Sequence, residues 1–121
     1  MPARLRLLEP PAFETAVQRF RAGDASTEDL RALAKHFLAV LSRVAPGGAV
    51  EVRVPPYAAV QVVGGLKHKR GTPPAVVEMD ASTWVALALG DLTWRDADRS
   101  GRLVASGERS DLGPLLPLDP S

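Results

Sequence analysis

The sequence predicts an α+β fold, in which helices pack against a sheet. Apolar residues recur with the helical period over the first 46 residues, and the period changes to two from Val50 onward. The apolar fraction of 45% and the charged fraction of 24% are typical of a packed globular protein. A chain of 121 residues is long enough for one core. We therefore expect one domain over 1–121, with N-terminal helices in 1–46 and the sheet and further helices in 49–118.

Two helices are predicted in the N-terminal part. Pro10–Pro11 begin the first helix and Gly23 ends it. Ser26 and Asp29 have the spacing of a capping box at the start of the second helix, which Pro46–Gly48 ends. Each helix has one apolar face, formed by Phe13, Val17 and Phe20 in the first and by Leu30, Leu33, Ala34, Phe37, Leu38, Leu41 and Val44 in the second.

Three strands are predicted next. Val50–Val54 alternates valines with charged residues, which places the valines on one face. Tyr57–Val63 is rich in β-branched residues and follows the break at Pro55–Pro56, so we expect an antiparallel pair. Ala75–Met79 is a third strand, after a polar loop rich in glycine and proline at 64–74.

A short helix with apolar residues on nearly every side is predicted at 81–89. Asp80 has the position of its N-cap, and Gly90 ends it. A helix of this kind needs to be covered on all sides, because each of its faces is apolar.

The C-terminal part is predicted to hold two more helices around a strand. Thr93 and Asp96 begin a short helix that ends at Gly101, and Arg102–Ser106 is a fourth strand. Ser110–Asp111 can cap a last short helix, whose regularity two prolines limit. This last helix contains Leu112, Leu115 and Leu116.

Composition excludes several kinds of chemistry. The chain has no cysteine, which excludes disulfides, thiolate nucleophiles and Cys-ligated zinc. Its net charge of +1 leaves no large positive field, so we expect no nucleic-acid partner. His36 and His68 are separate in sequence and have no metal-binding spacing; we expect a partly exposed helix residue and a loop residue. We therefore expect no catalytic residue, no metal, no cofactor and no enzyme activity.

An ordered set of short motifs from Asp80 to Leu118 resembles the sterol-carrier-protein family. The set comprises an acidic residue, a Thr-Trp pair, an apolar helix with a Gly-x-Leu end, an alanine, a second Gly-x-Leu on a strand, a Gly-Glu pair and a leucine-rich end. In this chain these are Asp80, Thr83–Trp84, Gly90–Trp94, Ala97, Gly101–Leu103, Ser106–Arg109 and Leu115–Leu118. Residues 50–61 and 70–74 further resemble short sterol-carrier-like proteins of actinobacteria.

The resemblance implies a mostly antiparallel sheet of about five strands, with helices packed on one face. The residue pattern itself yields four strands, so we expect the fifth in the loop at 64–74 or near the C-terminus. The resemblance also implies an apolar pocket for a fatty acyl chain, an acyl-CoA or a sterol-like lipid. We expect this pocket to be lined by Trp84, Val85, Leu87, Ala88, Leu115 and Leu116.

Two other features bear on partners. Lys67, Lys69 and Arg70 are the only concentrated charge and can contact an anionic headgroup, although a solvated hairpin tip explains them as well. No stretch approaches the roughly 20 apolar residues of a membrane span, and no signal peptide is evident, so we expect a cytoplasmic protein without stable membrane insertion. The chain also lacks the C-terminal targeting tripeptide of eukaryotic carriers, so a peroxisomal role does not carry over.

A different function remains open on the same fold. The apolar side chains can simply fill the core, in which case the chain is an interaction or accessory protein that presents an apolar surface to a partner or forms a homodimer. A filled core around Trp84 favours this alternative, and an open pocket favours lipid binding. Sterol-carrier-like modules also occur fused to isomerases, but no metal-binding partner domain is evident in this sequence.

Overall fold

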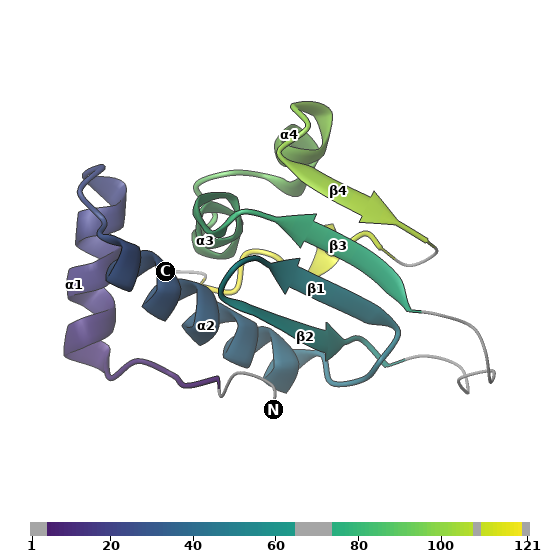
Figure 1. The fold of residues 1–121 in the computed structure, drawn as a ribbon, viewed down its shortest axis with the longest axis horizontal. Helices are drawn as coiled ribbons and strands as arrows, with labels where there is room; N and C mark the ends of the chain where they lie inside the picture. Colours follow the sequence, from purple (N-terminus) through teal and green to yellow (C-terminus); the bar gives the residue numbers. More distant parts are fainter. Residues whose placement is uncertain (1–4, 65–73, 108–109, 120–121) are drawn as a thin grey trace.

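The computed structural model describes residues 5–64, 74–107 and 110–119. Over these ranges the chain forms a mixed sheet with helices beside it (Figure 1). In chain order the elements are α1 (Pro10–Arg21), α2 (Thr27–Val44), β1 (Val50–Val54), β2 (Ala58–Val62), β3 (Ala75–Met79), α3 (Ala81–Leu89), α4 (Trp94–Arg99), β4 (Leu103–Ser106) and the 3-10 helix η1 (Gly113–Leu115).

The sheet has the strand order β2-β1-β3-β4. β1 is antiparallel to β2, and β3 is antiparallel to β4, whereas the central pair of β1 and β3 is parallel. The α+β class and the antiparallel pairing of the first two strands are confirmed. The expectation of about five mostly antiparallel strands is wrong for the described residues, which form four strands in a mixed sheet.

The parallel central pair follows from where β2 ends. Val62 of β2 is paired with Val50, so β2 ends beside the start of β1. At this end of the sheet the Ala49 amide donates to the Val63 carbonyl at 3.0 Å, and the Ala49 carbonyl accepts from the Ala75 amide at 3.0 Å. The chain thus leaves β2 and enters β3 beside the start of β1, and β3 runs in the same direction as β1. Residue alternation carries no information about strand direction, so the sequence could not predict this.

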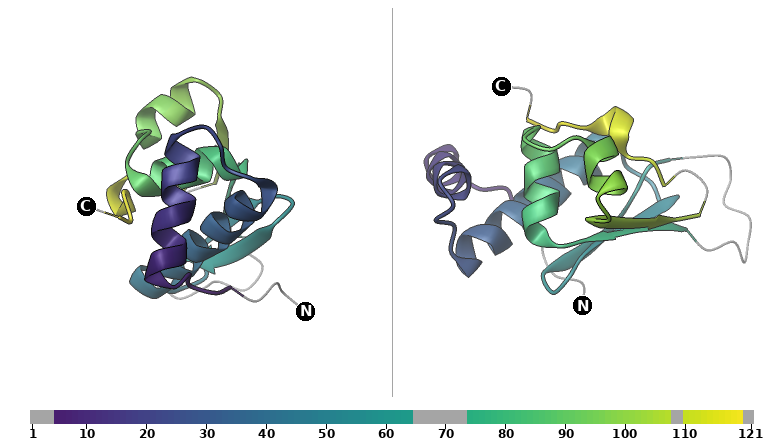
Figure 2. Two further views of the ribbon diagram at one scale, coloured as in Figure 1. Left: turned by 90° about the vertical axis from the view of Figure 1, so that its left-hand side faces the viewer. Right: turned by 90° about the horizontal axis from the view of Figure 1, so that it is seen from above.

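Among residues 5–64, 74–107 and 110–119, the helices cover one face of the sheet. In β1 the side chains of Val50, Val52 and Val54 are fully buried, whereas Glu51 and Arg53 point to the opposite face. Figure 2 shows the helices gathered on one side of the sheet. The sheet is therefore the outer wall of the molecule on its polar side, and the core lies between the valines and the helices.

The helices α2 and α3 form the inner layer of the core. Ser26 accepts from the Asp29 amide at 3.0 Å and its own amide donates to the Asp29 carboxylate, so the predicted capping box of α2 is confirmed. The Asp80 carboxylate accepts from the Thr83 amide at 2.8 Å, which confirms the predicted N-cap of α3. In α3 every residue except Ser82 and Ala86 is buried, as its apolar composition predicts.

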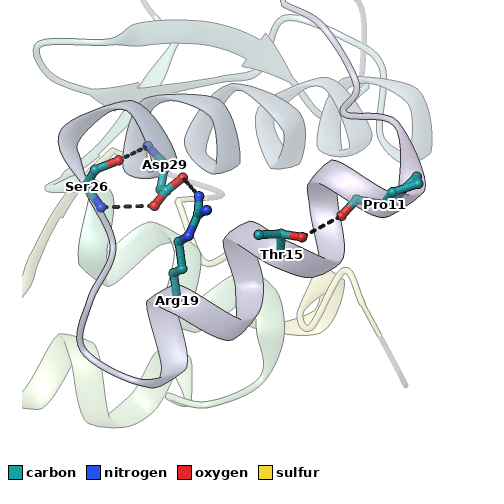
Figure 3. A network of polar contacts seen from close by, with 5 residues as sticks. All are labelled: Pro11, Thr15, Arg19, Ser26 and Asp29. Carbon is teal, nitrogen blue, oxygen red and sulfur yellow. Dashed lines mark hydrogen bonds and ion pairs between the residues drawn. The ribbon is translucent and has the colours of Figure 1, made fainter.

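The helix α1 packs on the outer side of α2 (Figure 1). Its buried residues are Ala16 and Val17, and two of its arginines form ion pairs with other parts of the chain. The Arg19 guanidinium contacts the Asp29 carboxylate at 3.2 Å, beside the capping box of α2 (Figure 3). The Arg21 guanidinium contacts both oxygens of Asp91, at 3.0 and 3.1 Å, after the end of α3.

Residues 110–119, here called the C-terminal strap, lie against α3 on the side away from the sheet (Figure 2). Leu112 is fully buried, and the amides of Leu118 and Asp119 both donate to the Ala88 carbonyl, at 2.9 and 3.1 Å. The predicted helix capped by Ser110–Asp111 is wrong, because the strap contains only the 3-10 helix η1, which has no side-chain cap. Pro114 and Pro117 lack the amide hydrogens that a longer helix needs.

Candidate ligand-binding hollow

The four predicted pocket residues on α3 are buried. Trp84, Val85 and Ala88 are fully buried, and Leu87 is 1% exposed. The Trp84 indole nitrogen donates to the carbonyl of Ala34 on α2 at 3.2 Å. This bond satisfies the polar edge of the indole inside the core, so Trp84 ties α3 to α2.

An open hollow of about 340 Å³ lies beside the C-terminal end of α3. We call it the Trp94 hollow, because the half-buried Trp94 is the largest side chain in its wall. The wall is mostly apolar and is formed by Leu87, Gly90, Leu92, Thr93, Trp94, Arg95, Gly113, Leu116 and Pro117.

The turn after α3 and the cap of α4 form one side of this hollow. Gly90 ends α3 with φ +85°, a conformation that a residue with a side chain rarely adopts, and so turns the chain toward α4. The Thr93 hydroxyl accepts from the Asp96 amide at 3.1 Å and caps α4, which confirms the predicted start and places Trp94 as its first residue.

The C-terminal strap supplies the opposite wall. Gly113 passes so close to Trp94 that a Cβ on Gly113 would lie 3.5 Å from the Trp94 Cβ and 2.9 Å from an oxygen of Asp111. That same Asp111 oxygen accepts from the Gly113 amide at 2.8 Å and fixes the turn. A Cβ on Gly90 would lie 3.3 Å from Pro117 of the strap. The two glycines therefore let the strap come close to α3 and α4.

The predicted pocket residues divide between this hollow and the core. Leu87 and Leu116 line the Trp94 hollow together, and Leu115 is half-buried on the strap outside its wall. Trp84, Val85 and Ala88 lie in the core and do not reach the hollow. The three predicted headgroup residues Lys67, Lys69 and Arg70 lie outside the described residues.

Sequence reasoning named only Leu87 and Leu116 among the wall residues; of those that it missed, Trp94 is the largest and Arg95 is charged. Trp94 follows a helix cap and precedes charged residues, so periodicity assigns it to no apolar face. The signal that could have identified Trp94 is a tryptophan at the polar start of a short helix. Its large apolar ring is shielded from water only when it packs against another part of the molecule.

A second hollow, of about 490 Å³, lies between α1 and α2. Small side chains such as Ala12, Ala16 and Ala32 contribute to its wall, and Thr15, Arg19 and Asp29 lie along it. Figure 3 shows that Arg19 reaches across to Asp29, and that the Thr15 hydroxyl donates to the Pro11 carbonyl at 3.0 Å. The polar side chains of Thr15, Arg19 and Asp29 therefore already have hydrogen-bond partners within the chain.

His36 is the one histidine among the described residues. Its Nδ1 accepts from the Leu8 amide at 2.9 Å, and its ring lies 4.6 Å from the Phe13 ring, measured between centroids. Burial lowers the pKa of His36, and the Asp119 carboxylate opposes this in part. His36 is half-buried and neutral, and it holds the N-terminal segment on α2.

Neither a metal site nor a membrane span is found in the described parts of the chain. Over residues 5–64, 74–107 and 110–119, no group of three or more histidine, aspartate or glutamate side chains could hold a metal ion. In the same ranges no helix is long and apolar enough to cross a membrane.

Comparison with known proteins supplies the family. The model of a family described as bacterial SCP ortholog matches residues 26–118, which include every element from α2 to η1. No curated protein matches the chain. The match begins after α1, so the helix that carries Arg19 and Arg21 lies outside it.

Proposed function

The chain belongs to the bacterial SCP ortholog family of sterol-carrier-like proteins, and from this we propose that it binds one apolar molecule, without catalysis, in the Trp94 hollow. One observation carries the proposal. Leu87, Leu92, Trp94 and Leu116 come from three parts of the chain and form one apolar wall that stays open to solvent. Concave sites lined by apolar and aromatic side chains are the usual sites for such ligands.

The size of the hollow favours a single alkyl chain. Its volume of about 340 Å³ is near the lower end of the range of about 300–1,000 Å³ for small-molecule pockets. Each buried methylene contributes about 0.8 kcal/mol, and association costs at least about 4 kcal/mol. A chain that buries about ten methylenes is then expected to gain at most about 4 kcal/mol net, which corresponds to a dissociation constant of about a millimolar or weaker. A fatty acyl chain fits this volume better than a complete sterol does.

Contact quenching of tryptophan fluorescence tests the proposal. A bromine-tipped alkyl carboxylate quenches an indole that it touches, so titration is expected to quench Trp94 and leave Trp84 unchanged. The Trp84→Phe variant, which retains Trp94, is expected to keep the saturable quenching, and the Trp94→Phe variant is expected to lose it. Quenching that follows Trp84 instead would place the ligand in the core, and the absence of saturable quenching in the native chain would refute lipid binding.

The burial of Trp84 favours a second candidate function. Its indole is fully buried and bonded to Ala34, so the part of α3 expected to line a tunnel is packed against α2 instead. This packing is the feature expected of an accessory protein that uses the fold without a ligand. The same titration separates the two, because an accessory protein would show no saturable quenching with any alkyl probe and would be tested next for self-association.

A further inference from the structure

Among the described residues, Arg95 is the one charged residue in the wall of the Trp94 hollow. It is the second residue of α4 and is exposed. Within residues 5–64, 74–107 and 110–119 its guanidinium takes part in no ion pair or side-chain hydrogen bond, unlike Arg19, Arg21, Arg31 and Arg53. An apolar wall with one guanidinium on it is the arrangement that a molecule with an apolar tail and an anionic head requires.

The carboxylates next to the hollow already have donors. Asp91, which follows Gly90 of the wall, accepts two hydrogen bonds from Arg21, and this contact raises the pKa of the Arg21 guanidinium. Asp111 accepts from the Gly113 amide at 2.8 Å. Asp91 is therefore paired with a cation from α1, and Asp111 is bonded within its own turn; among the described wall residues, Arg95 is the cation available to a ligand in the hollow.

We infer that Arg95 makes the Trp94 hollow selective for amphiphiles with a carboxylate head, such as a free fatty acid, over neutral or cationic amphiphiles of the same tail. The inference rests on the proposed function of the hollow. A guanidinium presents a planar fork of donors that matches the two oxygens of a carboxylate, and the apolar wall takes the tail. Because Arg95 is exposed, water and salt weaken the contact, and selectivity of about threefold to tenfold is expected.

Three ligands with identical decyl tails test the inference. Decanoate, decanol and decyltrimethylammonium are titrated separately, below their micelle-forming or solubility limits, into the native chain for calorimetry and into the Trp84→Phe variant for Trp94 emission. Decanoate is expected to bind about threefold to tenfold more tightly than decanol, with decyltrimethylammonium weakest. Added salt is expected to reduce the preference for decanoate.

Two variants test whether the charge of Arg95, and not a change in the fold, causes the preference for decanoate. Arg95→Gln is expected to bind decanoate no more tightly than decanol, because the substitution removes the charge that decanoate contacts. Arg99→Gln is the matched control, because Arg99 is an exposed arginine of the same helix outside the wall of the hollow, and it is expected to keep the preference. A preference that survives in Arg95→Gln, or equal binding of decanoate and decanol by the native chain, overturns the role of Arg95 and leaves the apolar site intact. Binding of neither ligand overturns both the proposed site and this inference.

Discussion

Trp84 and Trp94 lie on consecutive helices, but Trp84 is buried in the core, whereas Trp94 is half-buried in the wall of an open hollow. The all-apolar pattern around Trp84 correctly indicates burial. The same pattern cannot tell a core residue from a pocket residue, because the difference depends on whether a distant helix fills the adjacent space. Here the carbonyl of Ala34, on another helix, accepts from the Trp84 indole. Trp94 could not be assigned from its neighbours, since its wall includes strap residues that follow it in the chain.

Protonation of His36 is expected to weaken the fold. Burial lowers its pKa in the folded chain, so the unfolded chain binds the proton more readily. The stabilising effect is therefore complete above the ordinary histidine pKa of about 6.5 and is lost as pH falls below it toward the lower folded pKa. The imidazolium also cannot accept the hydrogen bond from the Leu8 amide, because both ring nitrogens then carry hydrogen.

Urea unfolding of the native chain and of His36→Gln at a series of pH values checks this prediction. The native free energy of unfolding is expected to fall as the pH drops below about 6.5. The variant is expected to change less over that window, because it lacks the titrating ring. Parallel curves for the two proteins would show that other groups cause the loss.

The N-terminal caps of the helices are the most predictable elements of this fold. Ser26, Asp80 and Thr93 each accept a hydrogen bond from a backbone amide in the first turn of the helix that follows, as their positions in the sequence predict. Caps are local and depend on residues three positions apart, so a single sequence reveals them. The pairing of β1 with β3 and the path of the strap depend on contacts between distant residues, and these were not predicted correctly.

Loss of the Ser26 hydroxyl is expected to destabilise the chain by about 1 kcal/mol. The Ser26→Ala variant leaves the Asp29 amide without its capping acceptor at the start of α2. Denaturant unfolding monitored by circular dichroism measures the change. Ser82→Ala is the control, because Ser82 is exposed on α3 and its hydroxyl makes no hydrogen bond to a described residue, and its effect is expected to stay within about 0.5 kcal/mol. Equal losses in the two variants would contradict a capping role.

The free energy of local unfolding is expected to differ between parts of the molecule. In the central strands β1 and β3, Val50, Val52 and Val77 are fully buried. The helix α1 contacts α2 on one side, buries Ala16 and Val17, and is held near its C-terminal end by the exposed side chains of Arg19 and Arg21. Segments with few buried apolar contacts open before the core does.

Hydrogen exchange followed by mass spectrometry is expected to show this order. Amides of α1 are expected to exchange before those of β1 and β3, and Arg21→Gln is expected to speed exchange in α1 while leaving the central strands unchanged, because it removes the contact with Asp91. Arg43→Gln is a suitable comparison, since Arg43 is exposed on α2 and far along the helix from α1. Simultaneous exchange of α1 and the sheet would show that the molecule opens as one unit.

The polar face of the sheet, which no described helix covers, makes the protein convenient for site-specific labelling. Ala59 of β2 is exposed and paired with Arg53, whose side chain points to the polar face. Because the sequence contains no cysteine, an Ala59→Cys substitution would introduce its single thiol. A fluorophore or surface linker attached there would lie across the sheet from the helices, so it could report on or immobilise the protein while the Trp94 hollow remained accessible.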